Sequence, residues 1–174
     1  QETRNNISML LSFEKKIEEK KLEVFFGPDS EKFIVLADRD SIYQTLYNLC
    51  DNAIKFSSES GKFRVSIKKL KSKKILVSVF NEGQGIADAD MPYIFDRFYK
   101  SDKSRGLNKS GTGLGLSMAY SIISQLGGHI EIESESGRGS LFRIFIPENK
   151  EIHDIPEVAR NHNHLVNGSG TILI

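Results

Sequence analysis

The hydrophobic positions of the chain follow two spacings, one typical of helices and one typical of strands. Three segments place apolar residues every three or four positions and are predicted to be helices: 7–21, 41–56 and 114–126. Six shorter runs, bounded by turn residues and mostly rich in β-branched or aromatic residues, are predicted to be strands: 22–26, 33–37, 62–68, 74–80, 129–135 and 140–146. A long glycine-rich segment, 81–113, separates the fourth strand from the last helix, and a loop of that length is typical of a lid.

The order of these elements predicts the fold class. Strands that follow each other directly favour hairpins, and three helices are enough to cover one face of a sheet. We therefore predict an α+β fold, a two-layer α/β sandwich with a mixed sheet covered on one face by about three helices. The 174 residues suit one domain, which we place at 1–147, followed by a C-terminal tail, 148–174, of unknown role.

Composition and charge narrow the class of partner. The 24 Lys and Arg residues against 23 Asp and Glu leave a net charge of +1, so we expect no nucleic-acid partner and no direct membrane contact by this domain. The single cysteine, Cys50, excludes an intrachain disulfide framework and favours a reducing, cytoplasmic setting. Because the chain does not begin with Met, we expect a fragment, which leaves membrane anchorage of the full-length protein open.

A polar stripe on the predicted helix 41–56 is the first candidate for chemistry. Asn48, Asn52 and Lys55 are spaced by four and then three residues, which places them on one helix face. A carboxamide oxygen is a ligand suited to Mg²⁺, and a lysine one turn further can neutralise phosphate oxygens. A helix side that faces solvent shows the same pattern, so the stripe alone leaves both interpretations open.

Two glycine-rich motifs flank the long loop. The segment 81–86, Asn-Glu-Gly-Gln-Gly-Ile, follows a strand and is either a close approach of the backbone to a ligand or an ordinary turn. The segment 111–116, Gly-Thr-Gly-Leu-Gly-Leu, opens a helix, whose free N–H groups favour phosphate. The second motif is neither a Walker A loop, since no Gly-Lys-Ser/Thr occurs, nor a Rossmann fingerprint.

Together and in this order, the motifs resemble those of the ATP-binding catalytic domain of sensor histidine kinases, within the family that also holds the gyrase, Hsp90 and MutL ATPases. The segments that resemble the N box, first glycine box, F box and second glycine box of this family are 48–56, 81–85, 95–100 and 111–116. The resemblance covers about residues 1–147. It implies the family's Bergerat-type sandwich, with nucleotide held between the N-box helix and a lid.

The resemblance implies ATP and Mg²⁺ as cofactors and assigns roles to individual residues. Asn52 would ligate Mg²⁺, Asn48 would assist at the metal and the phosphates, and Lys55 would contact phosphate, which makes Asn48 and Lys55 the expected catalytic residues. The other expected nucleotide contacts are Asn81, Gly83, Gly85, Ile86, Lys100, Arg105, Gly111, Thr112, Gly113, Leu114 and Gly115. Phe98 and Tyr99 are expected to anchor the lid in the core.

Two positions bear on mechanism. The family's hydrolases carry Glu at the position of Asn48 and use it to activate water, which an amide cannot do, so we expect in-line transfer to a protein acceptor. The first glycine box normally begins with Asp, whose carboxylate accepts a hydrogen bond from the adenine amino group, and here it begins with Asn81. The amide still accepts that bond but loses charge assistance on the order of 1 kcal/mol, which predicts weaker ATP binding or altered base selectivity.

The phosphoacceptor is expected on another domain. None of the four histidines, His129, His153, His162 and His164, lies on a predicted helix before the N box. The expected acceptor is therefore a histidine of the dimerisation domain of the same kinase, with a response regulator downstream in two-component signal transduction. We expect the isolated domain to be a monomer. Residues 1–20 are either its first helix or the end of the dimerisation helix pair.

Two other functions stay open at this point. The first is a degenerate nucleotide-binding or non-catalytic interaction module, in which Asn81 no longer holds adenine. The second is a protein-serine kinase of the anti-sigma-factor type, although the long lid and the F box resemble the histidine-kinase branch more closely.

Overall fold

A five-stranded sheet forms one layer of the molecule in a computed structural model that describes residues 12–27, 34–101, 112–148 and 171–173. The strands, in spatial order, are β1 (Glu23–Phe26), β3 (Lys62–Lys69), β4 (Lys74–Asn81), β6 (Gly139–Pro147) and β5 (His129–Glu135). β1 runs parallel to β3, and the other three pairings are antiparallel. The sheet is therefore mixed, as predicted.

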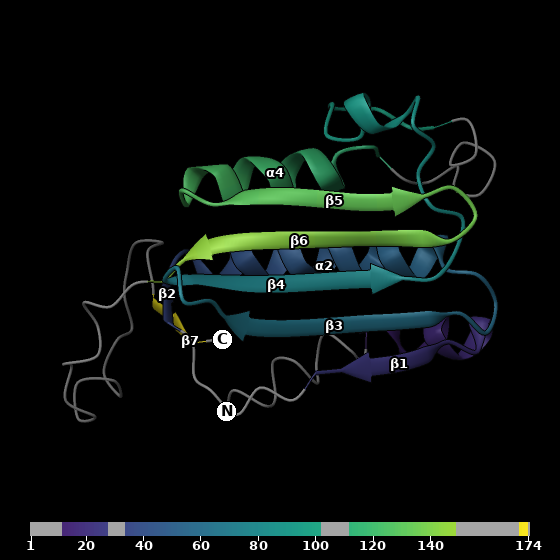
Figure 1. Ribbon diagram of the computed structural model, residues 1–174, viewed down its shortest axis with the longest axis horizontal. Helices are drawn as coiled ribbons and strands as arrows, with labels where there is room; N and C mark the ends of the chain where they lie inside the picture. Colours follow the sequence, from purple (N-terminus) through teal and green to yellow (C-terminus); the bar gives the residue numbers. More distant parts are fainter. Residues whose placement is uncertain (1–11, 28–33, 102–111, 149–170, 174) are drawn as a thin grey trace.

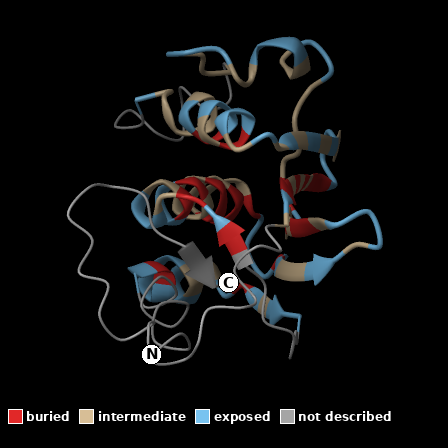
Figure 2. Cartoon of the chain, turned by 90° about the vertical axis from the view of Figure 1, so that its left-hand side faces the viewer, coloured by how far each residue is buried: buried red, intermediate tan, exposed pale blue. Residues whose placement is uncertain are grey.

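Three helices lie against one face of this sheet (Figure 1): the segment 12–20, α2 (Arg39–Phe56) and α4 (Gly115–Gln125). The apolar side chains between the layers form one cluster, in which Phe13, Leu49 and Ile123 come from the three helices. Alternate residues of the central strand β4 complete it, and Ile75 and Val77 are fully buried. Figure 2 shows buried positions, in red, both in the helices and in the strands of the sheet. The predicted α+β sandwich is confirmed.

The pairing of the first two strands differs from the prediction. β3 with β4, and β5 with β6, form the expected hairpins. β1 instead joins the main sheet next to β3, while β2 (Ile34–Leu36) pairs antiparallel with β7 (Thr171–Leu173), a strand that was not predicted. The hydrophobic pattern identifies a strand but not its partner, because a parallel and an antiparallel neighbour bury the same alternate side chains.

α2 begins and ends with hydrogen bonds from neighbouring residues to groups at its two ends. Asp38 precedes the helix, and its carboxylate accepts a hydrogen bond of 2.8 Å from the backbone N–H of Ser41. Hydrogen bonds from the side chain and then the backbone N–H of Ser41 lower the pKa of Asp38. At the other end the ammonium of Lys20 donates to the carbonyl oxygens of Lys55 and Ser57, the latter at 2.8 Å. The segment 12–20 thus holds the end of α2 from which the candidate site is built.

The described part of the chain contains no helix that combines the length and the apolarity of a membrane span. Between β4 and α4 the structure shows a short 3-10 helix, η1 (Met91–Tyr93), within the predicted lid region.

Candidate functional site

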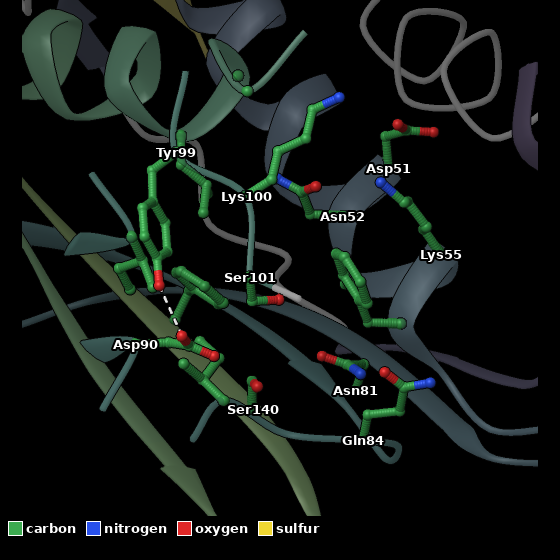
Figure 3. Close-up of a pocket in the computed structure, with 18 of the residues that line it drawn as sticks. Asp51, Asn52, Lys55, Asn81, Gln84, Asp90, Tyr99, Lys100, Ser101 and Ser140 are labelled. Carbon is green, nitrogen blue, oxygen red and sulfur yellow. Dashed lines mark hydrogen bonds between the residues drawn. The ribbon is translucent and has the colours of Figure 1, made fainter. Parts of the chain in front are cut away.

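A cavity of about 370 Å³ opens where the second half of α2, the end of β4 and the start of α4 meet (Figure 3). This volume is within the usual range of small-molecule sites. Ten residues singled out from the sequence line it: Asn48, Asn52, Lys55, Asn81, Gly85, Ile86, Lys100, Thr112, Gly113 and Gly115. The fold therefore gathers side chains from three segments that are far apart along the chain.

The other four residues expected to contact nucleotide are not seen in the cavity wall. Gly83 and Leu114 do not line the cavity. A Cβ at Gly83 would lie 2.1 Å from the carbonyl oxygen of Phe56, so this glycine is required by the close packing of the turn against the end of α2. Leu114 is the N-cap residue of α4. Arg105 and Gly111 lie outside the described residues.

Asn48 connects the two helices that border the cavity. Its side-chain Nδ2 donates a hydrogen bond of 3.2 Å to the carbonyl oxygen of Gly115, the first residue of α4. Its Oδ1 accepts a bond of 2.9 Å from the amide of Gln44, one turn earlier on α2. Both polar atoms of Asn48 are therefore engaged within the protein, which suits a residue that holds the start of α4 in place.

Asn52 is the amide better placed to meet a metal. It lines the cavity one turn after Asn48. No group of three His, Cys, Asp or Glu side chains within the described ranges could hold a metal ion by itself. Mg²⁺ is usually held by one or two protein oxygens together with substrate phosphates, so this donor set fits Mg²⁺ bound together with a nucleotide.

The same side of the cavity carries two ammonium groups, those of Lys55 and Lys100 (Figure 3). Burial lowers the pKa of Lys55; the carboxylate of Asp51 acts in the opposite direction, and the neighbouring charge of Lys100 lowers it further. Asp51 also accepts a 2.6 Å bond from Lys16 of the segment 12–20. This side of the cavity is suited to an anion, because the charges of Lys55 and Lys100 lie close together and the neighbouring carboxylate of Asp51 is already paired with Lys16.

Asn81 and Gln84 lie on the opposite side of the cavity, where amide groups are combined with apolar side chains (Figure 3). Asn81 is the last residue of β4, and the residue is 2% exposed. Its Nδ2 has no hydrogen-bond partner among the residues that the structure describes. The apolar residues Ala53, Ile86 and Phe142 line the cavity as well. A flat apolar ring with polar edges would be matched by such surroundings.

The middle of the predicted lid segment contacts its C-terminal end. The backbone N–H of Phe98 donates to the carbonyl oxygen of Gly113 at 3.0 Å, and a Cβ on Gly113, whose φ is +72°, would lie 2.8 Å from the backbone of Phe98. Phe98 is 71% exposed, so the expectation that it anchors the lid in the core is wrong. The hydroxyl of Tyr99 donates to Asp90 at 2.6 Å, and because both residues belong to the lid segment, this bond lies within the lid and does not attach it to the core.

Sequence reasoning missed several residues of the cavity wall: Asp51, Gln84, Asp90, Ser140 and Phe142. Ser140 lies opposite Asn81 in the register of β4 and β6, and Phe142 follows two residues later on the same strand. Only the pairing of these two strands reveals them, and the sequence does not specify that pairing. Asp51 and Gln84 lie inside the recognised motifs, where their positions could have indicated them.

Comparison with known proteins points to histidine kinases at the level of both the family model and individual relatives. A family model described as "Histidine kinase-, DNA gyrase B-, and HSP90-like ATPase" matches residues 37–150. The signal transduction histidine-protein kinase ArlS of Staphylococcus epidermidis is 40% identical over 110 residues, 63% of this chain and 24% of that protein. The sensor histidine kinase WalK of Bacillus subtilis is 38% identical over 128 residues, 73% of this chain and 21% of that protein. The chain spans about a quarter of the length of these relatives.

Solved structures share the architecture. The catalytic domain of the histidine kinase ThkA matches with a TM-score of 0.70 and 33% identity, over 84% of this chain and 93% of that chain. A structure of ThkA in complex with the response regulator protein TrrA matches with a TM-score of 0.66 and 31% identity, over 84% of this chain and 40% of that chain. The resemblance inferred from the sequence is thereby confirmed.

Proposed function

This chain belongs to the family of histidine kinase-, DNA gyrase B- and HSP90-like ATPases, as the ATP-binding catalytic domain of a sensor histidine kinase, and from this premise we propose its reaction. It binds Mg·ATP in the cavity and donates the γ-phosphoryl group to a histidine on the dimerisation domain of the same kinase. The observation that supports this best is the cavity itself, whose wall gathers the residues expected to contact nucleotide from α2, from the end of β4 and from both ends of the lid.

The two sides of the cavity suggest how the nucleotide lies. The phosphates face Lys55 and Lys100, whose charges they neutralise, and the purine lies against Ile86 and Phe142 with its polar edge at Asn81. Asn52 is the residue that would hold Mg²⁺ by its amide oxygen. When bound, the ion would neutralise charge on the phosphates and so favour transfer of the terminal one.

The geometry of Asn48 favours transfer over hydrolysis. An amide has no basic group that could take a proton from water, and here Nδ2 and Oδ1 are bonded to Gly115 and Gln44. The protein would therefore contribute position and charge neutralisation, and the nucleophile would come from the acceptor histidine.

The acceptor is proposed to lie outside the cavity and on another domain. Of the four histidines, the structure describes His129, whose ring stacks on Phe145 with 4.5 Å between ring centroids and does not line the cavity. A response regulator is the proposed downstream partner, as the complex of ThkA with TrrA suggests by similarity.

Isothermal titration of the purified chain with ATP in the presence of Mg²⁺ tests the proposal. We expect saturable binding at one site, with a Kd below about 1 mM, and competition by ADP. A Lys55→Met variant should weaken binding because it removes a phosphate contact. If wild-type protein binds no nucleotide at millimolar concentration, the non-catalytic interaction module that the sequence left open becomes the better account.

A further inference from the structure

One polar group in the cavity is left without a partner by the protein. Asn81 is 98% buried, and its Nδ2 donates to no acceptor in the described part of the chain. A buried amide donor without an acceptor is costly and is rare in folded proteins. Nδ2 is shielded within the protein and no hydrogen bond holds it there, so a turn of the amide about its Cβ–Cγ bond would bring it to an acceptor of a ligand in the cavity.

The surroundings of Asn81 indicate which part of a nucleotide reaches it. The cations Lys55 and Lys100 lie on the other side of the cavity and attract phosphate (Figure 3). Ile86 and Phe142 supply apolar surface for a ring. Asn81 therefore meets the edge of the base, which is the part of the ligand that differs between nucleotides.

A carboxamide and a carboxylate recognise that edge differently. Adenine presents an N6–H donor beside the N1 acceptor, whereas a 6-oxopurine presents the O6 acceptor beside an N1–H donor. An ionised carboxylate only accepts hydrogen bonds, so it pairs with the amino group of adenine and repels O6. A carboxamide has one donor end and one acceptor end, and it matches adenine in one orientation and a 6-oxopurine in the reversed one.

The protein does not hold the amide in either orientation. An adenine-specific site would need a neighbouring acceptor that keeps Nδ2 turned away from the 6-position of the base. No such acceptor is present among the described residues, since Nδ2 is unpartnered. The amide is thus free to present whichever atom the base requires.

We infer that Asn81 makes this cavity accept 6-oxopurine nucleotides, those with a hypoxanthine or guanine base, alongside adenine nucleotides. The inference rests on the proposed function, because it assumes that a nucleotide binds in this cavity. It makes Asn81 a residue that determines base specificity and adds a second class of nucleotide to the proposed ligands.

The test compares ATP with ITP, because these two differ only in the 6-position and the protonation of N1. Both are titrated with Mg²⁺ into the wild-type chain and into Asn81→Asp. For wild type we expect the two Kd values to agree within about threefold. For Asn81→Asp we expect tighter ATP binding and a preference for ATP over ITP of about tenfold or more. Lys55→Met is the matched control, since it should weaken both nucleotides by the same factor.

The outcomes separate this inference from the proposed function. If wild type binds ATP but prefers it over ITP as strongly as Asn81→Asp does, the inference is overturned and the proposed function stands. If wild type binds neither nucleotide, both fail. Should Asn81→Asp not fold, purine riboside triphosphate, which lacks a 6-substituent, replaces the variant. It should bind wild type more weakly than ATP and ITP do, and equal binding of all three overturns the inference.

Discussion

At the residue scale, one face of α2 brings together three side chains with separate tasks. Asn48 is bonded to Gly115 and so fixes the start of α4. Asn52 lines the cavity one turn later, and Lys55 presents a partly buried ammonium group. Because these tasks differ, substitutions at the three positions should affect different observables.

The metal role of Asn52 can be measured separately from nucleotide binding. In wild-type protein we expect Mg²⁺ to tighten ATP binding by at least about tenfold relative to EDTA. Asn52→Ala should remove most of this difference because the ion loses its protein ligand. Gln125→Ala, which removes an amide from the exposed end of α4, is the control and should keep the difference. An Asn52→Ala protein with the full Mg²⁺ effect refutes the assignment.

Lys55 should give ATP binding a dependence on alkaline pH. Burial lowers the pKa of its ammonium below the usual 10.5, and the charged form is the one that binds phosphate. Affinity should therefore be full near neutral pH and fall, by up to about tenfold per pH unit, as the pH rises through the lowered pKa. Calorimetry between pH 7 and about 10.5 tests this. Lys55→Arg should stay charged and flatten the profile, and identical profiles for both proteins contradict the account.

At the element scale, the segment 12–20 acts as a clamp on the end of α2. The ammonium of Lys20 donates to the carbonyl oxygens of Lys55 and Ser57, which lack partners further along the helix, and Lys16 pairs with Asp51 at 2.6 Å. Burial lowers the pKa of Lys20, because the ammonium loses part of its hydration. This loss reduces the stabilisation that its hydrogen bonds provide.

Removal of this clamp should cost stability. Lys20→Met keeps the aliphatic stem but leaves the last carbonyl oxygens of α2 without their donor, and we expect the free energy of unfolding to fall by about 1–2 kcal/mol. Urea denaturation measures it. Lys15→Met is the matched control: Lys15 has an 88% exposed side chain and an exposed ion pair with Glu19, which is worth little. Equal effects of the two substitutions count against a clamp.

Elements with strong periodicity were predictable from the sequence, whereas strand partners and side-chain orientation were not. The predicted helix 41–56 and strand 74–80 agree closely with α2 and β4, because their apolar residues face a single core. The pairing of β2 with β7, from opposite ends of the chain, has no local signal. The exposure of Phe98 was missed because an aromatic residue near a lid suggests anchoring, while here the backbone of Gly113 makes the contact.

At the scale of the whole molecule, the two layers leave the cavity at one end of the sandwich and His129 on strand β5, outside it. In the proposed reaction the chain supplies the phosphoryl group and another domain receives it. We therefore expect no acid-labile phosphate on the isolated chain after incubation with γ-labelled ATP and Mg²⁺, although ATP binds. Phosphorylated His129, detected by mass spectrometry at neutral pH, is the contrary result.

The most direct test of the central claim is a crystal structure of this chain grown with Mg²⁺ and a non-hydrolysable ATP analogue. The account predicts a purine whose edge is bonded to Asn81, phosphates near Lys55, and a metal ion on the amide oxygen of Asn52. An analogue bound at saturating concentration in another place, with α2 and the start of α4 enclosing no nucleotide, contradicts it.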